Sequence, residues 1–229
     1  MTPTFRTRLG RKIERLNKQI LAIGAQVEDH LRLSVKAVDY GDPQVAAQVI
    51  DGDIEIDQAE VDLEEKCLEI LALHQPVADD LRYLVAVLKI NNDLERIGDL
   101  AVNIAETAVF LGSLDSTERP FDFGPMALKT QEMLKQSLDA FVNADVRLAF
   151  DVCASDDEVD YMKHVIHEEF EKKMRSWEGN LEALVHLFLV SRHLERIADH
   201  ATNIAEDVIY MVTGQIHRHR GGDFAHQRP

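Results

Sequence analysis

The feature that most constrains this chain is a motif of thirteen residues that occurs twice, one hundred positions apart. The first copy runs from Leu94 to Glu106 and reads LERIGDLAVNIAE; the second runs from Leu194 to Glu206 and reads LERIADHATNIAE. Ten of the thirteen positions match, and no gap is needed. Because internal repetition marks a duplicated structural unit, the two halves of the chain should fold alike.

The spacing within the motif is that of an amphipathic helix. Its apolar residues recur every three or four positions, at Leu94, Ile97, Ala101 and Ile104 and again at the matching positions of the second copy. At about 100° per residue, the repeated polar side chains fall within roughly 80° of one another on the other side of the helix. We expect these stripes to face solvent or a partner: Glu95, Asp99, Asn103 and Glu106 in the first copy, and Glu195, Asp199, Asn203 and Glu206 in the second.

The rest of the chain is also helical in pattern. Ala, Leu, Glu and Ile abound, aromatic residues make up 6%, and no segment alternates as a strand would. The predicted helices cover residues 7–40, 43–74, 77–112, 125–153, 155–177 and 180–214. The predicted fold class is all-α, with two tandem, similar, antiparallel three-helix bundles, each with a modest core of its own. The predicted units are residues 1–111, a linker at 112–124, residues 125–214, and a flexible tail rich in His and Arg at 215–229.

Turn and cap residues set these boundaries. Gly41-Asp42-Pro43 combines a left-handed cap, an N-cap and a first helical residue, so one helix should end there and the next begin. Gln75-Pro76 is predicted to separate the second helix from the third, which carries the first motif. Gly179-Asn180 is predicted to precede the sixth helix, which carries the second motif. Ser155-Asp156-Asp157-Glu158 has the form of a capping box and is predicted to open the fifth helix.

Charge and cysteine content narrow the class of function. The formal net charge is −16, from 41 acidic and 25 basic residues, which disfavours nucleic acid as a partner and favours cations. Cys67 and Cys153 are too far apart for a zinc motif and are expected to be buried reduced thiols, as in the cytoplasm. No apolar run reaches the roughly 18 residues of a membrane span, and no signal peptide is recognisable. The expected location is cytoplasmic.

A second acidic stripe runs along the predicted second helix. Its residues repeat at the spacing of the motif: Asp53, Asp57, Glu60 and Glu64. The counterparts in the second half are Asp156, Asp160, Lys163 and His167, so Lys163 interrupts the acidic run there. If neighbouring helices pack antiparallel, each stripe can meet the motif of its own half. Clustered carboxylates suit iron, manganese, magnesium or calcium, with zinc less favoured.

The sequence therefore predicts two surface metal sites. The first would be formed by Glu95, Asp99, Asn103, Glu106, Asp53, Asp57, Glu60 and Glu64, and the second by Glu195, Asp199, Asn203, Glu206, Asp156, Asp160 and His167. The plainer alternative is a solvated helix face on which Arg96 and Arg196 make weak ion pairs. Recurrence of the same polar residues in both copies favours a specific role. His193 and His200 are interpreted as surface or auxiliary groups.

Enzymatic function is not expected. No histidine has the Glu-x-x-His spacing of a di-iron bundle, and neither a phosphate-binding Gly-rich loop nor a nucleophile elbow is present. No catalytic residue is predicted. The alternative to a metal-binding adaptor is a metal-free helical adaptor whose acidic faces dock on basic partner surfaces.

Other segments accompany the repeated motif, among them Gln75-Pro76-Val77-Ala78, Asp80-Leu81-Arg82, Asn92-Asp93 and His200-Ala201. Together they resemble the PhoU family of accessory and regulatory proteins of bacterial phosphate-specific transport, over nearly the whole chain. The resemblance implies paired three-helix bundles, multinuclear metal clusters at the motifs, with iron expected first and zinc, manganese or magnesium as alternatives, and a homodimer. It also implies repression of the phosphate-starvation (Pho) regulon when phosphate is plentiful.

The partners that the resemblance implies are the ATPase of the phosphate ABC transporter, PstB, and the sensor histidine kinase PhoR. Membrane contact would then come only through these partners. Two residues depart from the family pattern: Ala198 stands where Gly is common and Leu100 where His is common. Either change could alter the number of metal ions without altering the fold.

Overall fold

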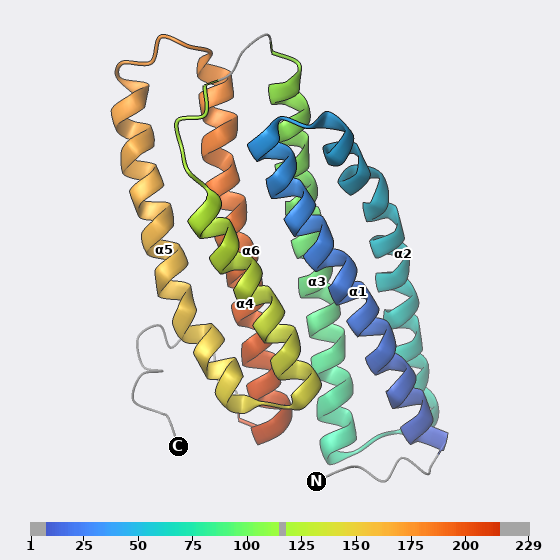
Figure 1. Ribbon diagram of the computed structural model, residues 1–229. Coiled ribbons are helices and arrows are strands. Elements are labelled where there is room, and N and C mark those ends of the chain that lie inside the picture. The colour runs from blue at the N-terminus through green and yellow to red at the C-terminus, as the bar shows by residue number, and fades with distance from the viewer. Residues whose placement is uncertain (1–7, 115–117, 216–229) are drawn as a thin grey trace.

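The computed structural model describes residues 8–114 and 118–215, and within these ranges the chain is helical without strands (Figure 1). The six helices are α1 (Arg8–Tyr40), α2 (Pro43–His74), α3 (Ala78–Gly112), α4 (Gly124–Asn143), α5 (Val146–Met174) and α6 (Leu181–Thr213). The predicted fold class is confirmed. The limits of the predicted units stay a prediction, and residues 1–7, 115–117 and 216–229, including nearly all of the predicted tail, lie outside the described residues.

The turn between α1 and α2 follows the predicted chemistry. Gly41 has φ +64°, a left-handed conformation that glycine adopts at little cost. The Asp42 side chain accepts hydrogen bonds from the backbone N–H groups of Gln44 (3.0 Å) and Val45 (3.2 Å), which satisfies donors that the first turn leaves free. Pro43 occupies the first turn, where its missing N–H has no cost.

The boundary between α4 and α5 was predicted about ten residues too late. Helix α4 ends at Asn143, Ala144 adopts a left-handed φ of 51°, and the Asp145 side chain caps α5 at the N–H groups of Arg147 and Leu148. Ser155 lies inside α5, where its hydroxyl donates to the Asp151 carbonyl, so the predicted capping box is wrong. The sequence pattern did not predict a turn here because the segment contains neither glycine nor proline.

Helices α3 and α6 lie side by side in the middle of the molecule and run in opposite directions (Figure 1). Helices α1 and α2 pack on α3, and α4 and α5 pack on α6. The apolar stripes of the motifs form the centre, with Leu94 and Leu194 fully buried. One continuous core joins all six helices, whereas two separate cores were expected. The difference arises because α3 and α6 each present apolar residues to the other half as well as to their own.

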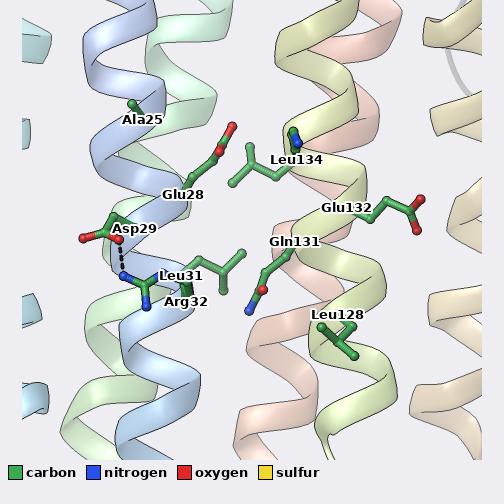
Figure 2. A pocket seen from close by; sticks show the side chains of 10 residues that line it. Ala25, Glu28, Asp29, Leu31, Arg32, Leu128, Gln131, Glu132 and Leu134 are labelled. Atoms are coloured by element: carbon green, nitrogen blue, oxygen red, sulfur yellow. Dashed lines mark hydrogen bonds and ion pairs between the residues drawn. The ribbon is translucent and has the colours of Figure 1, made fainter.

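The halves also meet where α1 touches α4, beside a pocket of about 420 Å³ (Figure 2). Buried Leu31 and Leu134 contribute apolar walls, and Asp29 forms an ion pair with Arg32 at its edge. Burial raises the pKa of Glu28, Asp139 raises it further, and Lys135 partly offsets both. The lining therefore carries charges of both signs.

Both cysteines are buried free thiols, as predicted. Burial raises the pKa of Cys67 and of Cys153 to about 12, so both are protonated and unreactive near neutral pH. Among the helices described, none is long and apolar enough to cross a membrane.

Candidate functional site

The acidic stripe of α2 lies beside the motif of α3, the arrangement expected if these two helices pack antiparallel. We call the following residues the first acidic cluster: Asp53, Asp57, Glu60 and Glu64 of α2 with Glu95 and Asp99 of α3. Asp53 is its most perturbed member. Burial, followed by the charges of Asp57 and Asp99, raises its pKa to about 6. One of its carboxylate oxygens is buried without a hydrogen-bond partner within the described residues.

The close approach of Asp53 to α3 depends on Gly98. A Cβ atom at this position would lie 3.1 Å from Oδ1 of Asp53, tighter than an ordinary contact. Glycine in a helix interior costs about 1 kcal/mol relative to alanine. Here it leaves room for the carboxylate beside the α3 backbone. The second half has Ala198 at the matching position.

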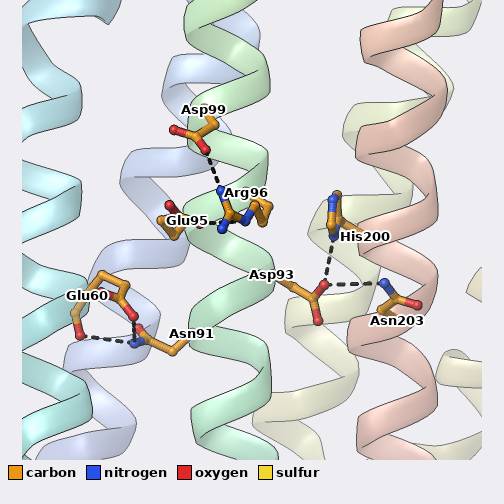
Figure 3. Close-up of polar contacts among 8 residues, drawn as sticks. All are labelled: Glu60, Asn91, Asp93, Glu95, Arg96, Asp99, His200 and Asn203. Atoms are coloured by element: carbon orange, nitrogen blue, oxygen red, sulfur yellow. Dashed lines mark hydrogen bonds and ion pairs between the residues drawn. The ribbon is translucent and has the colours of Figure 1, made fainter.

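Two of the three glutamates of the first acidic cluster, Glu60 and Glu95, make polar contacts at the boundary between α2 and α3. Buried Asn91 of α3 donates to both the backbone carbonyl and the side chain of Glu60, at 3.0 Å each (Figure 3). Burial and neighbouring carboxylates raise the pKa of Glu60 and of Glu95. Arg96 lies 3.2 Å from Glu95 and 3.1 Å from Asp99, so it screens the outer side of the cluster. Asp53, Asp57 and Glu60 of α2 thus lie near Glu95 and Asp99 of α3. Glu64 is linked to them through Glu60 of its own helix.

A matching arrangement of α5 and α6 forms the second acidic cluster, which comprises Asp156, Asp160, Glu195 and Asp199. Burial, and then the charges of Asp199 and Asp160, raises the pKa of Asp156 to about 6. Burial also raises the pKa of Asp199, where Glu195 adds to the effect. Lys163 of α5 contacts Glu195 directly, with 2.5 Å between Nζ and Oε1.

The remaining predicted ligands lie elsewhere. Asn103 and Glu106 are exposed on α3, and in the described part of the chain no hydrogen bond or ion pair joins their side chains to α2. His167 lies 3.4 Å from Glu171 and packs beside the ring of Phe188, whereas Glu206 lies near Cys153 and raises the pKa of that thiol. These residues extend the stripes along the helices but do not join the clusters.

The polar contact that the sequence did not reveal joins the two halves. Asp93 of α3 is 8% exposed; its Oδ1 lies 2.8 Å from Nδ1 of His200 and accepts a hydrogen bond from Asn203 (3.3 Å), both on α6 (Figure 3). Lys89 and Asp207 form an ion pair across the same interface. His200 is therefore an interface residue and not a surface group. Comparison of the two copies could have pointed to this contact, because Asp93 aligns with His193 and His200 aligns with Leu100, so neither residue is repeated.

The clusters fit a hard cation in donor chemistry. Their potential ligands are carboxylate oxygens. Burial and, to a smaller extent, neighbouring carboxylates raise the pKa of several of these groups, and a cation between them would relieve the repulsion. The unpartnered oxygen of Asp53 and the space at Gly98 mark the place where such an ion would be held in the first cluster. In residues 8–114 and 118–215, no three His, Cys, Asp or Glu side chains converge closely enough to hold a metal ion as they stand. Binding would require side-chain rotation.

Comparison with known protein families identifies one match. The model of the PhoU domain fits residues 20–108 and again residues 124–208, which are the two copies of the repeat. Each match contains one acidic cluster. The duplication read from the sequence is thus a duplication of a recognised domain.

Full-length relatives and solved structures are also similar. The chain is 33% identical over 204 residues to a phosphate-specific transport system accessory protein PhoU homolog of Clostridium acetobutylicum, covering 89% of this chain and 93% of that protein. It is 36% identical over 213 residues to the homolog of Aquifex aeolicus, covering 93% and 96%. The crystal structure of PhoU from Pseudomonas aeruginosa superposes with a TM-score of 0.86 at 34% identity, over 91% of this chain and 100% of that one.

Proposed function

The chain belongs to the PhoU family, and we propose that it is a negative regulator of phosphate uptake and of the phosphate-starvation response. An accessory, regulatory role in phosphate transport follows from membership, because the matched relatives are named phosphate-specific transport system accessory proteins. The proposed direction is repression when phosphate is plentiful. No catalytic step is part of the proposal.

The proposed partners are the ATPase of the phosphate transporter (PstB-like) and a sensor histidine kinase (PhoR-like), with the protein acting in the cytoplasm as a homodimer. Its surface supports an adaptor role, since long exposed helix faces carry most of the excess of acidic residues. Basic partner surfaces would complement such faces and speed encounter.

The proposal includes metal binding, and the main support for it is the environment of Asp53. A half-buried carboxylate with a pKa near 6, one unpartnered oxygen and two further acids beside it is an unfavourable arrangement unless a cation completes it. Asp53, Asp57 and Asp99 would hold the ion in the first acidic cluster, and Asp156, Asp160 and Asp199 in the second. Bound metal would supply positive charge that fixes neighbouring helices together. Iron is expected first, with zinc, manganese or magnesium as alternatives.

A metal-free adaptor is the second candidate, and the basic side chains within the clusters favour it. Arg96 and Lys163 already neutralise part of the acidic charge, and the carboxylates do not converge in groups of three within the described chain. Partner lysines or arginines would then take the place of metal. Elemental analysis of protein purified without an affinity tag separates the two candidates.

The regulatory proposal is tested by deletion of the gene. We expect phosphate-uptake genes to be expressed in phosphate-rich medium in the deletion strain, and repression to return when the wild-type gene is supplied. Co-purification with the transporter ATPase and the sensor kinase tests the partners. Normal repression in a clean deletion strain would contradict the assignment.

A further inference from the structure

A basic pocket lies between the first turns of α1 and the last turns of α2. It has a volume of about 520 Å³, and its lining includes Lys12, Arg15, Lys18 and Lys66. The one carboxylate in the lining, Glu69, contacts Lys12 at 2.6 Å. Four cations against one anion is an unusual local balance in a chain whose formal net charge is −16.

Two of these cations have no anionic partner in the part of the chain that the structure describes. Arg15 and Lys66 form no ion pair there, and Lys18 makes only an exposed pair with Glu14 at 3.2 Å. Like charges gathered around one pocket repel one another, so an anion placed between them would stabilise the arrangement. The pocket floor is closed by Leu16 and Ile70, each 2% exposed.

The duplicated fold does not require this charge pattern. The N-cap residues Asp42 and Asp145 and the stripe residues Asp53 and Asp156 align the halves with an offset of 103 positions. With that offset, Lys66 of α2 corresponds to Glu169 of α5, so the charge is reversed there. Arg15 has no helical counterpart, because α4 begins only at Gly124. The basic pocket is therefore specific to the first half.

We propose that this pocket binds a phosphate-bearing anion. Its volume lies within the range of small-ligand sites, and a single acidic side chain would fill little of it. An Arg guanidinium and several Lys ammonium groups present many donors to one tetrahedral, multiply charged group. Free phosphate or pyrophosphate and the headgroup of an anionic lipid share this chemistry. The proposal rests on α1 and α2 alone and stands whether or not the acidic clusters bind metal.

Calorimetric titration of the full chain with inorganic phosphate and with pyrophosphate tests the proposal, with EDTA present so that no cation bridges ligand and acidic clusters. Co-sedimentation with phosphatidylglycerol vesicles, against phosphatidylcholine vesicles, tests the lipid source. We expect Arg15→Gln/Lys66→Gln to weaken binding of the recognised probe at least tenfold. The matched control, Lys36→Gln/Arg147→Gln, removes the same charge from exposed positions outside the pocket and should bind as the wild type does.

Binding to free anions alone or to phosphatidylglycerol vesicles alone supports the proposal and identifies the source. Binding of neither probe by the wild type overturns it, as does equal binding by both double variants. Circular dichroism and the unfolding midpoint of each variant verify that the comparison is made between folded proteins.

Discussion

Lys163 of α5 lies opposite Glu195 of α6. The equivalent position in the first half is Glu60 of α2, which lies near Glu95 of α3. In the second half Nζ of Lys163 lies 2.5 Å from Oε1 of Glu195. In the first half burial and the charge of Asp99 raise the pKa of Glu95, and the negative charge of Glu60 adds to the effect. The two acidic clusters therefore differ by two units of charge at one position, although the motifs beside them are nearly identical.

This difference predicts unequal affinity of the two clusters for divalent cations. Lys163→Glu should strengthen Mn²⁺ binding to the second acidic cluster at least tenfold, or about 1.4 kcal/mol, because it replaces a repelling charge with a possible ligand. Glu60→Lys should weaken the first cluster by a similar factor. Calorimetric titration of tag-free protein with Mn²⁺ measures both. Unchanged titration curves for the two variants would mean that these positions do not face a bound ion.

Metal-free protein should lose stability as pH rises from about 4 to about 6. The pKa of Asp53 and of Asp156 is about 6 in the folded state, whereas an unperturbed aspartate, as in the unfolded chain, has a pKa of 3.8. Between these two pH values the folded state therefore holds more protons than the unfolded state. The penalty is absent below about pH 4 and complete above about pH 6. In EDTA, Asp53→Asn/Asp156→Asn should therefore gain stability over the wild type as pH increases across this window.

Urea denaturation at pH 4.0, 5.0, 6.0 and 7.5 measures this effect. Asp51→Asn, at an exposed position of the same helix α2, serves as the control and should follow the wild type. A constant difference between the double variant and the wild type at all four pH values would show that the two carboxylates ionise normally.

The buried acceptor between the halves should contribute measurably to stability. Asp93→Ala leaves His200 and Asn203 without the carboxylate that they contact at 2.8 and 3.3 Å, which should cost about 1–3 kcal/mol in the free energy of unfolding. Asp62→Ala replaces an exposed aspartate of α2 that accepts a hydrogen bond from Gln58, and should change stability by less than about 0.5 kcal/mol. Equal effects in chemical denaturation would contradict a structural role for the interface.

The helix pattern was readable from sequence wherever breaking residues were present. Gly41 and Pro43 marked one turn, but the equivalent turn at Ala144 and Asp145 has only an N-cap, so helical spacing continued across it without an evident break. The repeat could have located it, because Asp145 stands 103 positions after Asp42.

The contacts of the candidate site also fall into two groups, those that follow from helix periodicity and those that depend on packing between the halves. The meeting of Asp53 with Asp99 follows from two stripes of equal spacing on adjacent antiparallel helices, and was predicted. The contact between Asp93 and His200 depends on how α3 packs against α6, which periodicity within each helix does not determine. Asn203 belongs to this interface for the same reason, although its position in the motif suggested the acidic stripe.

Metal binding by the paired acidic clusters, as proposed above, is tested by the metal content of protein purified without an affinity tag. Inductively coupled plasma mass spectrometry should find bound metal in the wild type and a clear loss in Asp99→Asn/Asp199→Asn, because an amide supplies no charge to offset a cation. Helicity should be nearly unchanged, since neither side chain belongs to the core. A double variant that retains the full metal complement, or a wild type that contains none after growth and purification with iron, zinc and manganese present, would show that the clusters are not metal sites.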